Sequence, residues 1–183
     1  MRALAVFPDR REIRVIDDAS APSIQSPTEV KVEMLEVGIC GTDHEIANFE
    51  YGTPPDGSDH LILGHEGLGR VESIGAEVEG LTPGDLVVPI VRRPCTDPEC
   101  LACRHGRQDF CYTGEYTERG INQRHGFMTE AIVDDQQYFV PVADELREIG
   151  VLTEPLTIAE KALTQVWDVQ ERLPWACREA RQS

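Results

Sequence analysis

Apolar and polar residues alternate over short stretches of residues 1–150, and glycine or proline separates these stretches. This pattern predicts short β-strands joined by tight turns. Strands are expected over residues 2–7, 29–37, 70–74 and 86–91. Residues 127–133 and 138–142 are expected to form a hairpin around Asp134-Asp135, which would lie in a solvated turn. Residues 38–43, 51–59 and 92–126 are expected to be turns or loops.

A single long helix is predicted in the C-terminal part of the chain. It would begin near Pro155, which suits a first helical turn, and end at Leu173-Pro174. Thr157 and Glu160 have the spacing of a capping box. One helical face would carry the apolar residues Ile158, Ala162, Val166 and Trp167. Because strands and helices do not alternate, the predicted fold class is mainly β (α+β).

Length and charge limit the function classes. The 183 residues suit one ordinary domain with a core that needs no disulfides. With 33 acidic and 17 basic residues, the net charge of −16 disfavours nucleic acid and anionic membrane surfaces as partners. No apolar stretch approaches the ~20 residues that span a bilayer. The N-terminus does not resemble a signal peptide, so the expected location is cytoplasmic.

No dinucleotide-binding fingerprint is found in the sequence. Such a fingerprint places Gly-x-Gly-x-x-Gly between a strand and a helix. The nearest candidate, Gly67-x-Gly69, has Glu72 where the third glycine belongs. Any nicotinamide cofactor would therefore bind outside these residues.

The strongest chemical signal is a group of four cysteines, separated by four, two and seven residues: Cys95, Cys100, Cys103 and Cys111. Four thiolates in one loop can surround a tetrahedral zinc ion and leave no open position, which is typical of a structural site. The loop has too little apolar content to fold alone, so zinc would supply its folding energy. Free thiols or a redox-active cluster are the alternative.

A second candidate site combines Cys40 with the His65-Glu66 pair and, further along the chain, Glu154. A thiolate, an imidazole and a carboxylate can hold a catalytic zinc with a position open for water or substrate. Asp43 would accept the second ring proton of His65. The spacing alone is weak evidence, because a lone cysteine is more often a small core residue and a lone histidine a structural one.

Four motifs in one order give the chain a family resemblance: Gly38-Ile39-Cys40-Gly41-Thr42-Asp43, Gly64-His65-Glu66, Pro83-Gly84-Asp85-Leu86-Val87 and the four-cysteine loop. The chain resembles the N-terminal catalytic domain of zinc-dependent medium-chain alcohol dehydrogenases. That domain is GroES-like, a partly open β-barrel with few helices. Segments such as Asp59-His60-Leu61-Ile62-Leu63 and Gly106-Arg107-Gln108-Asp109-Phe110-Cys111 are most similar to glucose 1-dehydrogenases of archaea and bacteria.

The resemblance implies a division of the chain and a set of roles. Residues 1–175 would be the catalytic domain, with a zinc lobe at about 92–113, and 176–183 the start of a linker to a missing cofactor domain. The catalytic zinc would be bound by Cys40, His65, Glu66 and, directly or through water, Glu154. Thr42 would contact the reacting oxygen, with Asp43 and His44 assisting, and Glu118 and Glu154 would bind sugar hydroxyls. The structural zinc would be bound by Cys95, Cys100, Cys103 and Cys111, with Cys95 the departure because the family's common first interval is two residues.

The implied activity is oxidation of glucose or another aldose at C1 to the lactone. It would use catalytic and structural zinc, with NAD or NADP bound through the missing domain, and the full-length protein would be a dimer or tetramer. The fragment alone would show no turnover. Alternatives are another zinc dehydrogenase of this superfamily, acting on a polyol, threonine or an alcohol, or a non-catalytic module that needs only the structural zinc.

Overall fold

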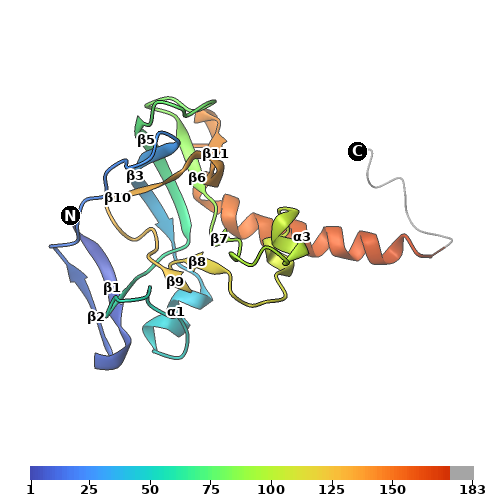
Figure 1. Cartoon of the computed structure of the whole chain (residues 1–183), viewed down its shortest axis with the longest axis horizontal. Helices are drawn as coiled ribbons and strands as arrows, with labels where there is room; N and C mark the ends of the chain where they lie inside the picture. Colours follow the sequence, from blue (N-terminus) through green and yellow to red (C-terminus); the bar gives the residue numbers. More distant parts are fainter. Residues whose placement is uncertain (174–183) are drawn as a thin grey trace.

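The computed structural model describes residues 1–173 and builds them around three β-sheets. One sheet has the strand order β2-β1-β4, the central one β10-β3-β5-β6-β11, and the small third one β7-β8-β9. Figure 1 shows the central sheet above the β1-β2 ribbon, with the small sheet between them. Trp175 and Cys177, together with the predicted linker, lie outside the described residues.

The strands are β1 (Ala3–Phe7), β2 (Glu12–Ile16), β3 (Glu29–Gly38), β4 (Leu61–Ile62), β5 (Glu66–Ile74), β6 (Leu86–Pro89), β7 (Arg92–Arg93), β8 (Thr117–Arg119), β9 (Gln123–Arg124), β10 (Ala131–Asp135) and β11 (Phe139–Val142). The α-helices are α1 (Gly41–Ala47), α2 (Leu101–Arg104) and α3 (Thr153–Gln170). Short 3₁₀ turns cover Pro8–Arg10, Gln108–Phe110, Gln136–Tyr138, Asp144–Leu146 and Gly150–Leu152. The predicted mainly β fold with few helices is confirmed.

The main core lies on the central sheet. Alternate residues of β3, Val30 and Val32, are fully buried and pack with Val71, Val87 and Phe127. This burial of every second residue is the reason that the alternating pattern found these strands.

The predicted hairpin of residues 127–142 is wrong. Strand β10 pairs with β3 and strand β11 pairs with β6, so the two lie at opposite edges of the central sheet. The 3₁₀ turn Gln136–Tyr138 carries the chain from one edge to the other. Nearness in sequence suggested the pairing, but β3 and β6 offered partners that only the folded sheet brings into place.

The expected turn at residues 38–43 is in part helix, because α1 begins at Gly41. The Asp43 carboxylate accepts a hydrogen bond from the Cys40 backbone N–H at 3.0 Å, which caps the helix from its third residue. Ile46 is buried on the inner face of α1 against Leu61 and Leu63. Capping and one buried side chain are enough to hold so short a helix in place.

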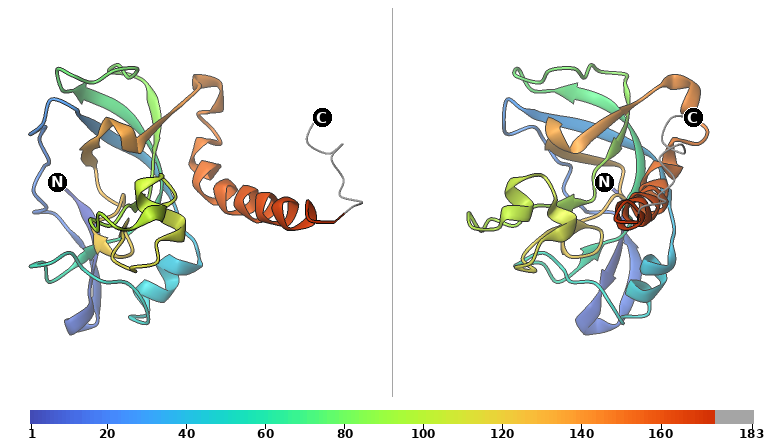
Figure 2. Two further views of the ribbon diagram at one scale, coloured as in Figure 1. Left: turned by 45° about the vertical axis from the view of Figure 1, so that its right-hand side comes forward. Right: turned by 90° about the vertical axis from the view of Figure 1, so that its right-hand side faces the viewer.

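Helix α3 begins at Thr153, two residues before the predicted start, and ends at Gln170, before Leu173. The expected capping box is absent: Thr157 donates its hydroxyl hydrogen bond back to the Glu154 carbonyl at 2.7 Å. Figure 2 shows α3 projecting away from the sheets. The apolar residues predicted to share a face are therefore largely exposed, Ile158 by 64% and Trp167 by 38%.

In the described part of the chain, no helix is both long and apolar enough to cross a lipid bilayer.

Candidate metal and substrate site

The structure brings Cys40, His65 and Glu66 together, with their candidate ligand atoms all within 4.8 Å of one another. Cys40 lies where β3 passes into α1, and His65 and Glu66 lie where β4 passes into β5. The Cys40 Sγ is 3.0 Å from the Nε2 of His65. Neighbouring ends of the central sheet thus supply all three side chains.

The glycine at the end of β3 makes room for one of these side chains. Gly38 pairs directly with Glu66 across the β3–β5 ladder. A Cβ atom at Gly38 would overlap the Glu66 carboxylate, so a larger residue there would push this carboxylate out of the cluster.

Asp43 supports both Cys40 and His65 from behind. One oxygen accepts from the Cys40 N–H, and the other lies 3.5 Å from Nδ1 of His65, too far for a hydrogen bond. Both of these facing atoms are buried without a hydrogen-bond partner. A small rotation of the ring would let Nδ1–H donate to Asp43, which fixes the tautomer that presents Nε2 to a metal ion.

The side chains around His65 and Asp43 favour the charged forms of both residues. Burial by itself lowers the pKa of His65, but the Asp43 carboxylate and the Cys40 sulfur outweigh it and raise the pKa to about 9. Burial raises the pKa of Asp43, yet His65 and the Cys40 N–H bring it below its usual value. The neighbours of His65 therefore favour positive charge at this position.

Glu154 lies on the first turn of α3 and does not join the ligand atoms of the cluster. Burial raises the pKa of Glu154, the positive His65 lowers it, and the negative charges of Glu66, Asp43 and Glu118 raise it further. Glu154 thus lies within electrostatic reach of His65 and Glu66.

Thr42 and His44 lie on the first turn of α1, Thr42 half-buried and His44 exposed. Among the described residues, neither side chain has a hydrogen bond to the cluster. Thr42 and His44 are near the site because they follow Cys40 closely in the chain.

Glu118 lies on β8, with its side chain only 10% exposed. Arg92 of β7 donates from both Nε and Nη2 to Oε1 of Glu118, at 2.9 and 2.7 Å. The guanidinium carbon of Arg92 lies 4.1 Å from the centre of the Tyr116 ring. Burial and the negative charge of Glu118 raise the pKa of Tyr51, which places that phenol in the same neighbourhood.

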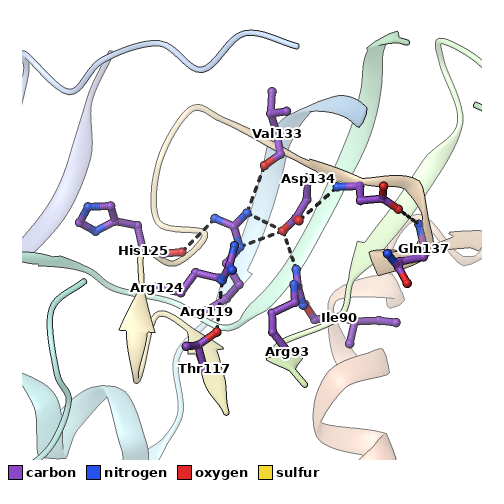
Figure 3. A network of polar contacts seen from close by, with 10 residues as sticks. Ile90, Arg93, Thr117, Arg119, Arg124, His125, Val133, Asp134 and Gln137 are labelled. Carbon is purple, nitrogen blue, oxygen red and sulfur yellow. Dashed lines mark hydrogen bonds and ion pairs between the residues drawn. The ribbon is translucent and has the colours of Figure 1, made fainter. Parts of the chain in front are cut away.

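A buried ion network behind this sheet was missed by the sequence analysis. Figure 3 shows Arg93 and Arg119 converging on Asp134, with Nη2 contacts at 2.6 and 2.5 Å. Arg119 also donates to the backbone carbonyls of His125 and Val133. Asp134 is therefore buried and doubly paired, so the expected solvated turn is wrong at this residue. The adjacent residues Arg92 and Arg93 were the signal in the sequence. Neighbouring residues of a strand face opposite sides, so one of two adjacent arginines has to point inward and needs a buried acidic partner.

The four clustered cysteines also meet, with their Sγ atoms within 4.8 Å of one another. Cys95, the departure from the family spacing, is buried among the other three. The Thr113 hydroxyl lowers the pKa of Cys111, whereas burial raises the pKa of the neighbouring Cys103. Helix α3 touches this lobe through Lys161, whose Nζ lies 3.1 Å from Asp109.

Both groups have donor sets that suit zinc. Four thiolates form a closed tetrahedral set, whereas one thiolate, one imidazole and one carboxylate leave room for a further ligand. The Nδ1 of His65 lies 3.5 Å from the Asp43 carboxylate, the kind of partner that orients a metal-binding histidine. The mainly β domain thus carries two metal-type sites, one closed and one open and half-buried.

Comparison with known proteins gives the family. Residues 26–144 match the alcohol dehydrogenase GroES-like domain, and the chain belongs to that family. It is 45% identical to a glucose 1-dehydrogenase of Methanocella arvoryzae, over 98% of this chain and 50% of the relative. The chain thus spans about half the length of the curated relatives it matches.

Solved structures agree with this assignment. A glucose dehydrogenase of Haloferax mediterranei in complex with NADP, Zn and gluconolactone is 35% identical, with a TM-score of 0.84 over 96% of this chain and 48% of that one. A galactitol-1-phosphate dehydrogenase of Escherichia coli is 27% identical, with a TM-score of 0.72 over 86% of this chain and 43% of that one. The predicted family resemblance is confirmed.

Proposed function

We propose that this chain is the metal-binding and substrate-facing part of a zinc-dependent dehydrogenase that oxidises glucose, or another aldose, at C1 to the lactone. The observation that carries the proposal is the Cys40–His65–Glu66 group, with Asp43 beside His65 and with Glu154 within electrostatic reach of both His65 and Glu118. The similarity to glucose dehydrogenases over nearly the whole chain supports the choice of sugar.

Zinc at Cys40, His65 and Glu66 would lower the pKa of the substrate hydroxyl, and a nicotinamide cofactor bound outside this chain would accept the hydride. Thr42 holds the reacting oxygen through its hydroxyl, and the proton passes from Thr42 towards the exposed His44. Glu118 and Glu154 accept hydrogen bonds from the other sugar hydroxyls, which a polyhydroxyl substrate requires. Asp43 keeps the imidazole of His65 oriented.

The cysteine lobe serves a structural zinc bound by Cys95, Cys100, Cys103 and Cys111. Residues 1–175 are proposed as the catalytic domain and 176–183 as the start of a linker to a cofactor domain. The proposed location is the cytoplasm, where thiols stay reduced, and the proposed full-length assembly is a dimer or tetramer.

Metal content tests the two-site arrangement. The purified chain should hold about two zinc ions, and Cys40→Ser and Cys103→Ser should each remove a different one. Cobalt substitution separates them, because a four-thiolate site gives much stronger sulfur-to-metal absorption than a site with one thiolate. One zinc lost only in Cys103→Ser would support a purely structural module. Little zinc and reversible disulfides would support a redox cluster.

Ligand-observed NMR on the zinc-loaded chain tests the substrate. Glucose, galactose and xylose should bind more tightly than sorbitol, threonine or ethanol, and Glu118→Gln should weaken the sugars selectively. A preference for sorbitol, threonine or ethanol would keep the zinc site and reject the aldose. The chain alone should form no NADH or NADPH from glucose.

A further inference from the structure

The short ladder between β7 and β8 has two chemically different faces. Arg92 pairs with Glu118 and Arg93 with Thr117 across this antiparallel ladder. Because neighbouring strand residues point to opposite sides, Arg92 and Glu118 share one face, and Arg93 and Arg119 share the other. On the first face Glu118 lies within electrostatic reach of Glu154, and the second face meets Asp134 of β10.

The rear face is anchored to the central sheet. Asp134 of β10 accepts from Arg93 at 2.6 Å and from Arg119 at 2.5 and 3.1 Å, and all three side chains are at most 11% exposed. Asp134 itself pairs with Val30 of β3, within the main core. The ladder that carries Glu118 is therefore fixed to a strand of the main core.

The front face fixes the Glu118 side chain. Arg92 directs two N–H groups at a single oxygen, Oε1, and stacks its guanidinium on Tyr116. The other oxygen, Oε2, has no hydrogen-bond partner among the described residues. A planar guanidinium held by an aromatic ring loses little further freedom when it binds a carboxylate, so the direction of Oε2 is set in advance.

We propose that Arg92 is a positioning residue that binds Oε1 of Glu118 and thereby aims Oε2 at a hydroxyl group of a neutral sugar. This inference rests on the proposed function, since it takes sugar as the substrate. The positive charge of Arg92 is neutralised by its ion pair with Glu118. The carboxylates of Glu66 and Glu154 add further negative charge near this pair. The site therefore suits an uncharged polyol and disfavours a sugar phosphate.

The test measures glucose affinity of the zinc-loaded chain by ligand-observed NMR. Arg92→Met should weaken binding about tenfold, the scale of one hydrogen bond to a charged group, and Arg92→Lys should lose less. Arg2→Met is the matched control, because Arg2 pairs with Glu130 through Nε at 2.9 Å on a remote, exposed surface. That control should bind glucose like the unchanged chain.

A double-variant cycle separates positioning from general damage. In a Glu118→Gln background, Arg92→Met should have little additional effect, because the carboxylate it positions is gone. The cobalt spectrum of the Cys40 site should be the same in all variants, and glucose 6-phosphate should bind more weakly than glucose to the unchanged chain.

Two results would overturn the inference in different ways. Unchanged glucose affinity in Arg92→Met would reject the role of Arg92 and leave the proposed function intact, and so would equal losses with and without Glu118. No glucose binding by the unchanged zinc-loaded chain would reject the aldose substrate, and the positioning role with it.

Discussion

The four-cysteine lobe takes its ligands from residues 95–111 of one loop, whereas Cys40 and His65 are separated by 25 residues and meet through the central sheet. Around the lobe, Leu101, Phe110 and Tyr112 are about half exposed or more. Around Cys40 and His65, Ile46, Leu61 and Leu63 are buried. The first group is defined by local sequence and lacks a core, and the second has a core and depends on distant strand pairing.

This difference has an energetic consequence. A loop without buried apolar area cannot offset its conformational entropy, so the lobe needs a metal ion to stay ordered. The Cys40 group sits on hydrogen-bonded strands beside a hydrophobic core, so we expect its backbone to stay ordered when the ion is removed. Four predictions test this contrast, from the largest expected effect to the smallest.

Removal of zinc should affect the two regions very differently. A chelator should remove most of the folding free energy, roughly 10 kcal/mol, that a structural zinc supplies to the lobe. Residues 95–111 should therefore lose their ordered conformation. Hydrogen exchange should show loss of protection at the amides of Arg104 and Cys111 and little change in β3 and β5. Equal loss of protection in β3 and β5 would contradict the contrast.

The Asp134 network joins the lobe-bearing segment to the central sheet, so its loss should weaken that connection. Asp134→Asn leaves two buried guanidinium groups with a weaker partner and should destabilise the chain by about 3–5 kcal/mol in urea unfolding. The adjacent Asp135→Asn is the control. Asp135 accepts from the Thr28 hydroxyl at 2.6 Å near the surface, and its change should cost about 1 kcal/mol. Equal losses of stability in Asp134→Asn and Asp135→Asn would show that the ion network stabilises the chain no more than an ordinary surface hydrogen bond does.

Asp43 acts on the Cys40 group alone. Asp43→Asn retains an acceptor for the Cys40 N–H but removes the negative charge beside His65. Zinc affinity at the Cys40 site should fall about 10- to 100-fold, as for other residues that orient a ligating histidine. Competition with a chromophoric chelator measures it, and the lobe zinc is the internal control. A matching loss at the lobe would indicate general unfolding instead.

His125 belongs to neither metal group. Its titration should make the stability of the β-sheet region depend on pH. Burial, with the positive charges of His60 and Arg119, lowers the pKa of His125 to about 4 from 6.5. The unfolded chain then binds the proton first, so stability is lost as pH falls from about 6.5 towards 4. The ring is only partly buried, which limits this loss to about 1–2 kcal/mol. His125→Asn, which keeps an acceptor for the Ile62 N–H, should flatten the urea-unfolding profile over this range.

The sequence predicted correctly those features that residues close together in the chain determine. The alternation of Val30 and Val32 found β3, and the density of cysteines found the lobe, including the unusual Cys95. The helix start was wrong by two residues because Thr157 bonds to the Glu154 carbonyl instead of capping the helix. Strand β2 was missed, since its outward residues Ile13 and Val15 are exposed and its pattern is weak.

Other features depend on contacts that sequence spacing does not describe. The partners of β10 and β11 were decided by β3 and β6, far away in the chain. Asp134-Asp135 looked like a surface turn, and two arginines from β7 and β8 made Asp134 a buried centre. The link between Arg92 and Glu118 arises from the same short ladder.

The sequence by itself determined which residue types are available for metal and sugar chemistry, because thiolates, imidazoles and carboxylates carry that chemistry wherever they stand. It also determined the cysteine lobe, whose ligands are neighbours along one loop. Only the tertiary structure decided which carboxylate joins Cys40 and His65, that Glu154 lies within electrostatic reach of His65, and that Arg92 holds Glu118. Side-chain direction in a strand depends on which strands pair and in which register, and distant core contacts fix both.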